Sequence, residues 1–261
     1  ALGAAVGGAL LGPVIGAVAS AAGTGPAFSA AAIAGTALIV AAFFVPRPHG
    51  SGNQGLRTAL PALRDRQVLT GMWLTTVPGL AFGVIDTLAP LRLNALGVTA
   101  TMIGGTFLIS AALETGLSPL AGRLSDRRGA LMPIQLSLVA AVAVSLLAST
   151  ARPAVVLVVV LVIGMPGFGT MFAPATALLS GGAHRLGLNQ GLAFGLGNLA
   201  WASGQGIAAA ASGAIAQATS DLVPYLLLAA LCLATLVGIR PGSRRLVVQA
   251  VRASQGLGRT R

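Results

Sequence analysis

The chain has 261 residues, of which 55% are apolar and only 8% are charged, and its mean hydropathy is +0.88. These values exclude an ordinary soluble domain and predict a protein embedded in a lipid bilayer. All sixteen basic residues are arginine, and five acids leave a formal net charge of +11. The arginines lie in short gaps between apolar runs, a distribution that argues against nucleic-acid binding.

The reactive side chains are too few and too scattered for an enzyme site. The chain has two histidines, one cysteine and no lysine. Cys232 lies inside the last apolar run, so neither an intramolecular disulfide nor a cysteine-based metal site is possible. No spacing assembles a metal cluster or a nucleophile with its base. We therefore expect no enzymatic activity, no metal and no bound cofactor.

Eight apolar runs are long enough to be membrane spans, for which about 20 residues are needed. They alternate with short gaps that are rich or poor in arginine. The sequence therefore predicts an all-α polytopic membrane protein with eight transmembrane helices. The predicted spans are residues 2–22, 28–45, 68–91, 100–121, 130–149, 153–179, 188–217 and 222–239.

The arginines predict the orientation of these spans, because short cytoplasmic loops retain positive charge. Alternate gaps and the tail place fourteen arginines on one side, and only Arg92 and Arg152 on the other. We therefore expect a multi-pass protein of the cell membrane with both termini in the cytoplasm. The linker 46–67 and the segment 122–129 are expected on the same side.

The first predicted span contains the sequence GALLGPVIGA, with Gly8, Gly12, Pro13 and Gly16. Glycines four residues apart form a flat strip that permits close helix contact, and Pro13 bends the helix because it lacks a backbone donor. Small-residue packing in any membrane helix would also explain the pattern. The following segment, residues 46–67, is rich in proline, glycine and arginine and is typical of a linker between two bundles.

The sequence GRLSDRRG, residues 122–129, is a charged segment between two long apolar runs. Its arginines cannot lie in hydrocarbon, so we expect a short loop on one side of the membrane. Glycines at both ends permit a tight turn, and Asp126 can neutralise an arginine or face a helix N-terminus. The motif residues are Gly122, Arg123, Asp126, Arg127, Arg128 and Gly129.

The pattern G-x-L-S-D-R-x-G between apolar helices resembles the loop motif of the major facilitator superfamily of secondary transporters. Ala130 departs from the family pattern, which continues with a basic residue. The glycine-proline pattern of the first span is similar to the fifth-helix motif of the antiporter branch. The resemblance implies alternating access, in which two six-helix bundles rock around a central cavity and an ion gradient drives transport.

The resemblance also implies a division of the chain. Residues 1–45 would be the last two helices of the N-terminal bundle, and residues 46–67 the cytoplasmic linker. Residues 68–240 would form the complete C-terminal bundle, followed by a basic cytoplasmic tail over residues 241–261. On this alignment the first four helices, which a complete transporter needs, are missing.

Two acids lie within predicted spans away from the charged segment, namely Asp86 and Glu114. A carboxylate in hydrocarbon is unfavourable by several kcal/mol, so such groups usually face protein or water and are candidates for a proton pathway. Structural roles explain them as well. Asp86 would then cap a helix or pair with Arg92, and Glu114 would neutralise an arginine of residues 122–129.

The seventh predicted span has Phe194, Asn198, Trp201 and Gln205 at helical spacing. Rings and amides on one face suit a cavity for an amphipathic molecule, because stacking is tolerant and amides orient polar groups. Ordinary packing and hydrogen bonding in a helix bundle would give the same pattern.

The sixth predicted span is interrupted by glycines and prolines in the sequence GMPGFGTMFAP. An interrupted helix can act as a gate in a transporter, and Met165, Phe168 and Phe172 would then line the path. Alternatively, these are ordinary kinks.

The resemblance of the first span to the antiporter branch favours proton-coupled export of a small amphipathic molecule or drug across the bilayer, with the proton gradient as energy source. One alternative is an uptake symporter of the same fold for a metabolite such as a sugar or organic acid. Another is a truncated membrane module that does not transport.

Overall fold

The computed structural model describes residues 23–44, 54 and 60–239, and within these ranges helices are the only regular secondary structure. The all-helical prediction is confirmed there. The glycine-proline pattern at Gly8, Gly12, Pro13 and Gly16 lies outside the described residues, as does the basic tail. The α-helices are α2 (Thr24–Phe43), α4 (Arg66–Ala95), α5 (Ala100–Arg128), α6 (Leu131–Thr150), α7 (Ala154–Gly169), α8 (Phe172–Arg185), α9 (Gln190–Ala218) and α10 (Leu222–Gly238), and η1 (Pro61–Arg64) is a short 3-10 helix.

Four helical segments are long and apolar enough to cross a membrane. They are Arg66–Ala95, Ala100–Ser125, Leu131–Thr150 and the combined segment Ala154–Arg185. Gly25–Ala41 and Leu222–Gly238 are shorter apolar helices. These segments support a multi-pass membrane protein, and the count of eight spans stays a prediction.

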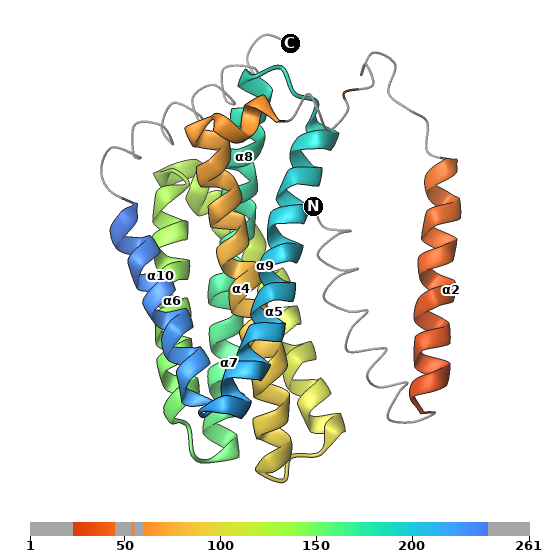
Figure 1. The fold of residues 1–261 in the computed structure, drawn as a ribbon, viewed down its shortest axis with the longest axis vertical. Coiled ribbons are helices and arrows are strands. Elements are labelled where there is room, and N and C mark those ends of the chain that lie inside the picture. Colours follow the sequence, from red (N-terminus) through yellow and green to blue (C-terminus); the bar gives the residue numbers. More distant parts are fainter. Residues whose placement is uncertain (1–22, 45–53, 55–59, 240–261) are drawn as a thin grey trace.

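Helices α4 to α10 form one bundle whose successive spans alternate in direction, with α7 and α8 following each other along one span (Figure 1). The end of α5, the end of α8 and the start of α4 therefore share one end of the bundle. Arg127, Arg128 and Arg185 lie at that end, whereas Arg92 is in the last turn of α4 at the opposite end. Helix α2 stands apart from this bundle in the view.

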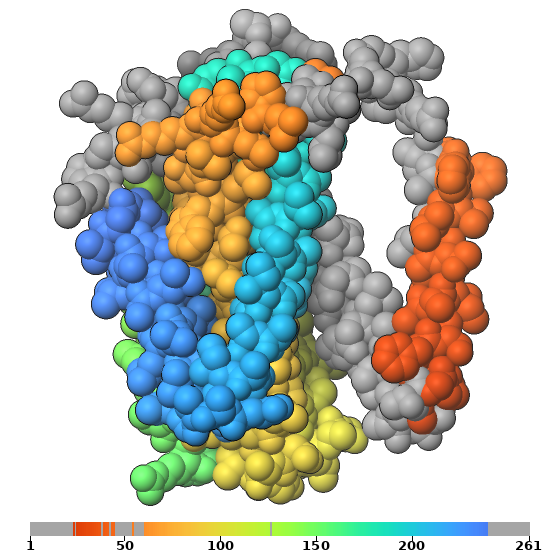
Figure 2. Space-filling view, in the orientation of Figure 1, coloured from red at the N-terminus to blue at the C-terminus, as the bar shows by residue number. Residues whose placement is uncertain are grey.

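Helix α4 occupies a central position and packs against α8 and α9. Helix α6 contacts α7 and α10, and α5 contacts mainly α7. Figure 2 shows that α4, α9 and α10 form a continuous surface on the viewed face. The large apolar side chains that fill the bundle interior include Leu74, Ile85, Leu138, Leu161, Phe168 and Tyr225.

The predicted loop at residues 122–129 was wrong, because α5 continues through it to Arg128. The sequence between the two glycines contains no helix breaker. Arg127 and Arg128 in the last turn also complement the negative end of the helix dipole. The chain turns only at Gly129, whose φ of +83° is a left-handed conformation that favours glycine.

The predicted interruption of the sixth span is confirmed, because α7 ends at Gly169 and α8 begins at Phe172. Pro166 and Pro174 have no backbone N–H, so neither can donate to the carbonyl four residues earlier. Thr170 stabilises the break, because its hydroxyl donates to the Gly167 carbonyl at 2.9 Å. Its Oγ1 also lies 3.1 Å from the hydroxyl oxygen of Ser137 on α6.

Candidate functional site

The site begins at the contact between α4 and α9, where small residues let the two backbones approach closely. Gly79 and Gly83 on α4 face the carbonyl oxygens of Trp201 and Gln205, and a methyl group at either glycine would collide with them. Gly204 on α9 is also confined, by the Thr76 carbonyl. We call this contact the α4–α9 seam.

Asp86 lies three residues after Gly83, so the α4–α9 seam brings it to the same level as Gln205. The Gln205 amide Nε2 donates to the Asp86 carboxylate Oδ2 at 3.4 Å, a long hydrogen bond. Asp86 is exposed, and Gln205 is half-buried. The seam therefore joins two candidate residues that sequence analysis selected separately.

Aromatic rings extend from this contact into the bundle. The Trp201 ring lies edge-on to Phe82 at a centroid distance of 6.5 Å, and Phe82 lies edge-on to Phe168 at 5.1 Å. Phe194 and Asn198 are exposed on the same stripe of α9 as Trp201. Phe194 and Asn198 therefore face outward on α9, whereas Trp201 is half-buried and packs on Phe82.

The three candidates of the interrupted span occupy different environments. Met165 and Phe168 are buried in the core, with exposed fractions of 4% and 2%, so they line no open surface in this conformation. Phe172, the first residue of α8, is 38% exposed. A gating role for these residues stays a prediction.

The Glu114 side chain, on α5, is half-buried and packs against Gly169 at the end of α7. A methyl group at Gly169 would overlap the carboxylate, so the close contact requires glycine there. Counted by helical rise from the bundle end where α4 begins and α5 ends, Asp86 and Glu114 differ in depth by about 9 Å.

Neither acid has an arginine partner within the ranges that the structure describes, where the ion pair present joins Asp65 to Arg185. The expected structural pairing of Asp86 with Arg92 is not observed. Arg92 instead caps the C-terminal end of α6, with its guanidinium donating to the carbonyls of Ala148 at 2.7 Å, Ser149 at 3.3 Å and Ala151 at 2.5 Å.

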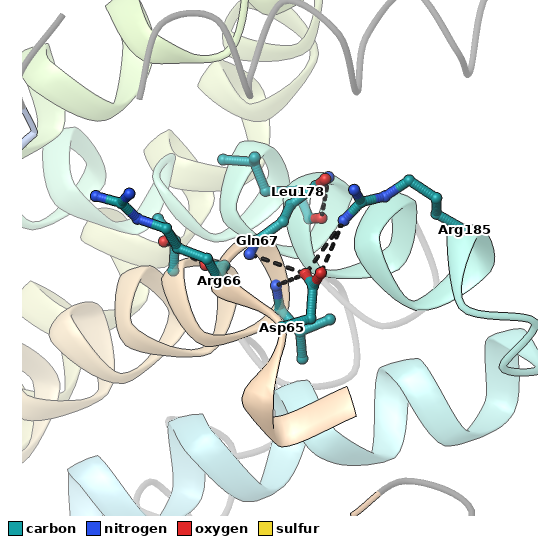
Figure 3. A network of polar contacts seen from close by, with 7 residues as sticks. Asp65, Arg66, Gln67, Leu178 and Arg185 are labelled. Atoms are coloured by element: carbon teal, nitrogen blue, oxygen red, sulfur yellow. Dashed lines mark hydrogen bonds and ion pairs between the residues drawn. The ribbon is translucent and has the colours of Figure 1, made fainter. Parts of the chain in front are cut away.

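A second polar network lies at the other end of α4 (Figure 3). Asp65 caps α4 by accepting from the backbone N–H groups of Gln67 and Val68, and its carboxylate also accepts from the Arg185 guanidinium at 3.1 Å. Gln67 donates to the Leu178 carbonyl at 3.2 Å. The network fastens the start of α4 to α8.

Sequence reasoning missed the glycines of α4, although Gly79 and Gly83 have the four-residue spacing that marks a close helix contact. It also missed the Arg92 cap and the Asp65–Arg185 pair, for which a single sequence gives no signal. In the described part of the chain, no three side chains of histidine, cysteine, aspartate or glutamate gather where they could hold a metal.

Comparison with known proteins identifies the family. The model of the Major Facilitator Superfamily matches residues 1–204. No curated protein and no solved structure matches the chain. The match covers most of the chain and agrees with the bundle of antiparallel apolar helices. The chain belongs to the major facilitator superfamily of membrane transporters.

Proposed function

We propose that this transporter exports a small amphipathic molecule in exchange for protons, by alternating access. The observation that carries the proposal is the Asp86–Gln205 contact at 3.4 Å on a face that also presents Phe194, Asn198 and Trp201. Rings supply a tolerant apolar surface, and the amides and the carboxylate orient polar groups. This combination suits a ligand with one apolar and one polar part.

Coupling to protons follows from the two acids. A carboxylate that closes against apolar surroundings without a cation is unfavourable by several kcal/mol, and protonation removes that penalty. Protonation of Asp86 or Glu114 would therefore favour conformations in which its side chain is enclosed. Glu114 lies against the break between α7 and α8, so its charge state would act on the least regular part of the bundle.

The direction of transport is tested by measuring proton movement with substrate in proteoliposomes that contain the natural full-length protein. Movement of protons and substrate in opposite directions supports export by antiport, whereas movement in the same direction indicates an uptake symporter. We expect Asp86→Asn and Glu114→Gln to abolish proton-linked flux. Asp221→Asn, in an exposed acid that precedes α10, is the matched control and should transport normally. Unchanged flux in both site variants would remove the two acids from the mechanism.

We also propose that the bundle end that carries Arg127, Arg128 and Arg185 faces the cytoplasm. A thiol introduced at Ser125, near the end of α5, should resist a membrane-impermeant reagent added outside intact cells. A thiol at Ser220, which precedes α10 at the opposite end, should react. The native Cys232 is buried and gives a low background. External labelling at residue 125 would reverse the proposed orientation.

A further inference from the structure

We infer that α5, α6 and α7 form a binding site for one acyl chain of an anionic phospholipid, whose head group binds at Arg127 and Arg128. The site is a groove with a volume of about 340 Å³. This inference rests on the membrane location of the bundle and does not depend on the proposed proton coupling. The groove is lined by Leu117, Leu120, Leu124, Leu136, Pro166 and Thr170, among others.

The wall of the groove suits hydrocarbon. Leu117, Leu120 and Leu136 have exposed fractions of 41%, 55% and 53%, so each leaves about half of its apolar surface uncovered. The polar groups in the wall satisfy each other, because Ser137 and Thr170 are hydrogen-bonded at 3.1 Å. The groove therefore offers dispersion contacts and no unpaired polar group to a ligand.

The charge at one end of the groove selects the ligand. Leu117, Ala121, Leu124 and Arg128 are spaced by four, three and four residues, so they share one face of α5. Arg127 follows Leu124 by three residues, and both arginines are exposed. Asp126 directly precedes them in the sequence, but with Arg123 the segment 123–128 still carries a net positive charge.

The length of this stripe also fits a lipid. From Leu117 to Arg128 the helix rises by about 16 Å, which is close to half of the roughly 30 Å hydrocarbon thickness of a bilayer. An acyl chain in the groove would therefore reach the middle of the membrane while its phosphate lies beside the arginines. An apolar helix of another protein would leave these arginines without a partner, which favours an anionic lipid as the occupant.

The test measures lipid binding to the purified natural full-length protein by native mass spectrometry, with melting temperature as a second readout. Phosphatidylglycerol and phosphatidylcholine with identical acyl chains are compared. We expect phosphatidylglycerol to bind roughly 30-fold more tightly, the equivalent of about 1 kcal/mol for each of two arginines. Equal binding of the two lipids would overturn the inference.

Matched variants separate the groove from general surface charge. Arg127→Gln, Arg128→Gln and their combination should remove the preference stepwise, whereas Arg152→Gln at the opposite end should keep it. Ala121→Phe should fill the groove and weaken binding of both lipids about tenfold, in proportion to the loss of buried apolar surface. Ala112→Phe is its control, because nine residues place Ala112 on the opposite side of α5, where it is exposed.

Two results would contradict the site as described. One is a loss of preference in Arg152→Gln as large as in the Arg127 and Arg128 variants, which would indicate diffuse electrostatics. The other is unchanged binding in Ala121→Phe, or competition by glycerol 3-phosphate as strong as by the lipid, since either would exclude the acyl chain from the groove.

Discussion

Helices α4 and α5 follow each other in the chain and have nearly equal length, 30 and 29 residues, but they are held in different ways. In an apolar 18-residue stretch of each helix, 61% of the α4 residues are buried and only 11% of those of α5. Helix α4 meets α9 backbone to backbone, is capped by Asp65 and contributes Arg92 as the cap of α6. Helix α5 packs mainly on α7 and leaves most of its surface free.

The difference suggests a division of roles between the two acids. Asp86 belongs to the tightly packed pair α4 and α9, where close backbone contact leaves little room for adjustment. Glu114 belongs to the less buried α5 and touches the break between α7 and α8. We therefore propose that adjustments within the bundle during alternating access occur mainly where α5 meets the break between α7 and α8, beside Glu114.

The largest predicted effect comes from disrupting the α4–α9 seam. Gly83→Leu should lower the free energy of unfolding by about 3 kcal/mol, because the new side chain would overlap the Gln205 carbonyl and Ala208. Gly116→Leu on α5 is the control and should change stability little, because no atom lies within 4 Å of a Cβ built there. Unfolding in mixed micelles can be followed by the fluorescence of Trp73 and Trp201, which lie on α4 and α9. Equal losses of stability in both variants would contradict the inference that α4 is packed more tightly than α5.

Removal of the Arg92 side chain, with which α4 caps α6, should have the next largest effect on stability. Arg92→Met should lower the free energy of unfolding by about 2 kcal/mol, because three carbonyls at the end of α6 lose a charged donor. Arg152→Met removes the other arginine at this end of the bundle, which is exposed, and should be nearly neutral. If the two variants unfold alike, Arg92 is not an anchor of α4.

The helices themselves could largely be predicted from sequence, because an apolar run that must cross hydrocarbon fixes both length and position. The predicted span 130–149 became α6, Leu131–Thr150, and the predicted interruption of the sixth span fell at Gly169. The error at residues 122–129 came from equating charge with a loop. Arginine is a good helix former, so α5 extends beyond its apolar part until Gly129 turns the chain.

The contacts between helices could not be predicted, because spacing on one helix does not identify the face that it meets. Asp86 and Gln205 were selected for separate reasons, the first as an acid in a span and the second as part of an amide and aromatic stripe. Only the packing of Gly79 and Gly83 on α9 brings them together. The contact of Glu114 with Gly169 likewise depends on how α5 lies against α7.

A smaller effect is expected where α5 touches the break between α7 and α8. Gly169→Ala should lower the free energy of unfolding by about 1.5 kcal/mol, because its methyl group would displace the Glu114 carboxylate. Glu114→Ala in the same chain should restore much of this loss, since it removes the group that is displaced. A double-mutant cycle on micelle unfolding measures the interaction. Additive losses would mean that residues 114 and 169 do not contact each other.

The smallest predicted effect concerns the ion pair at the start of α4, which tests whether charge or capping holds this helix. Asp65→Asn should lower the free energy of unfolding by only about 0.5 kcal/mol, because asparagine still caps α4 and the partner Arg185 is 54% exposed. Asp65→Ala also removes the two hydrogen bonds to Gln67 and Val68, so it should lose about 1 kcal/mol more. Added salt screens the ion pair, so it should lower the free energy of unfolding of the wild type toward that of Asp65→Asn. The difference between Asp65→Asn and Asp65→Ala should not change. If Asp65→Asn is as damaging as Asp65→Ala, the ion pair and not the cap fastens α4 to α8.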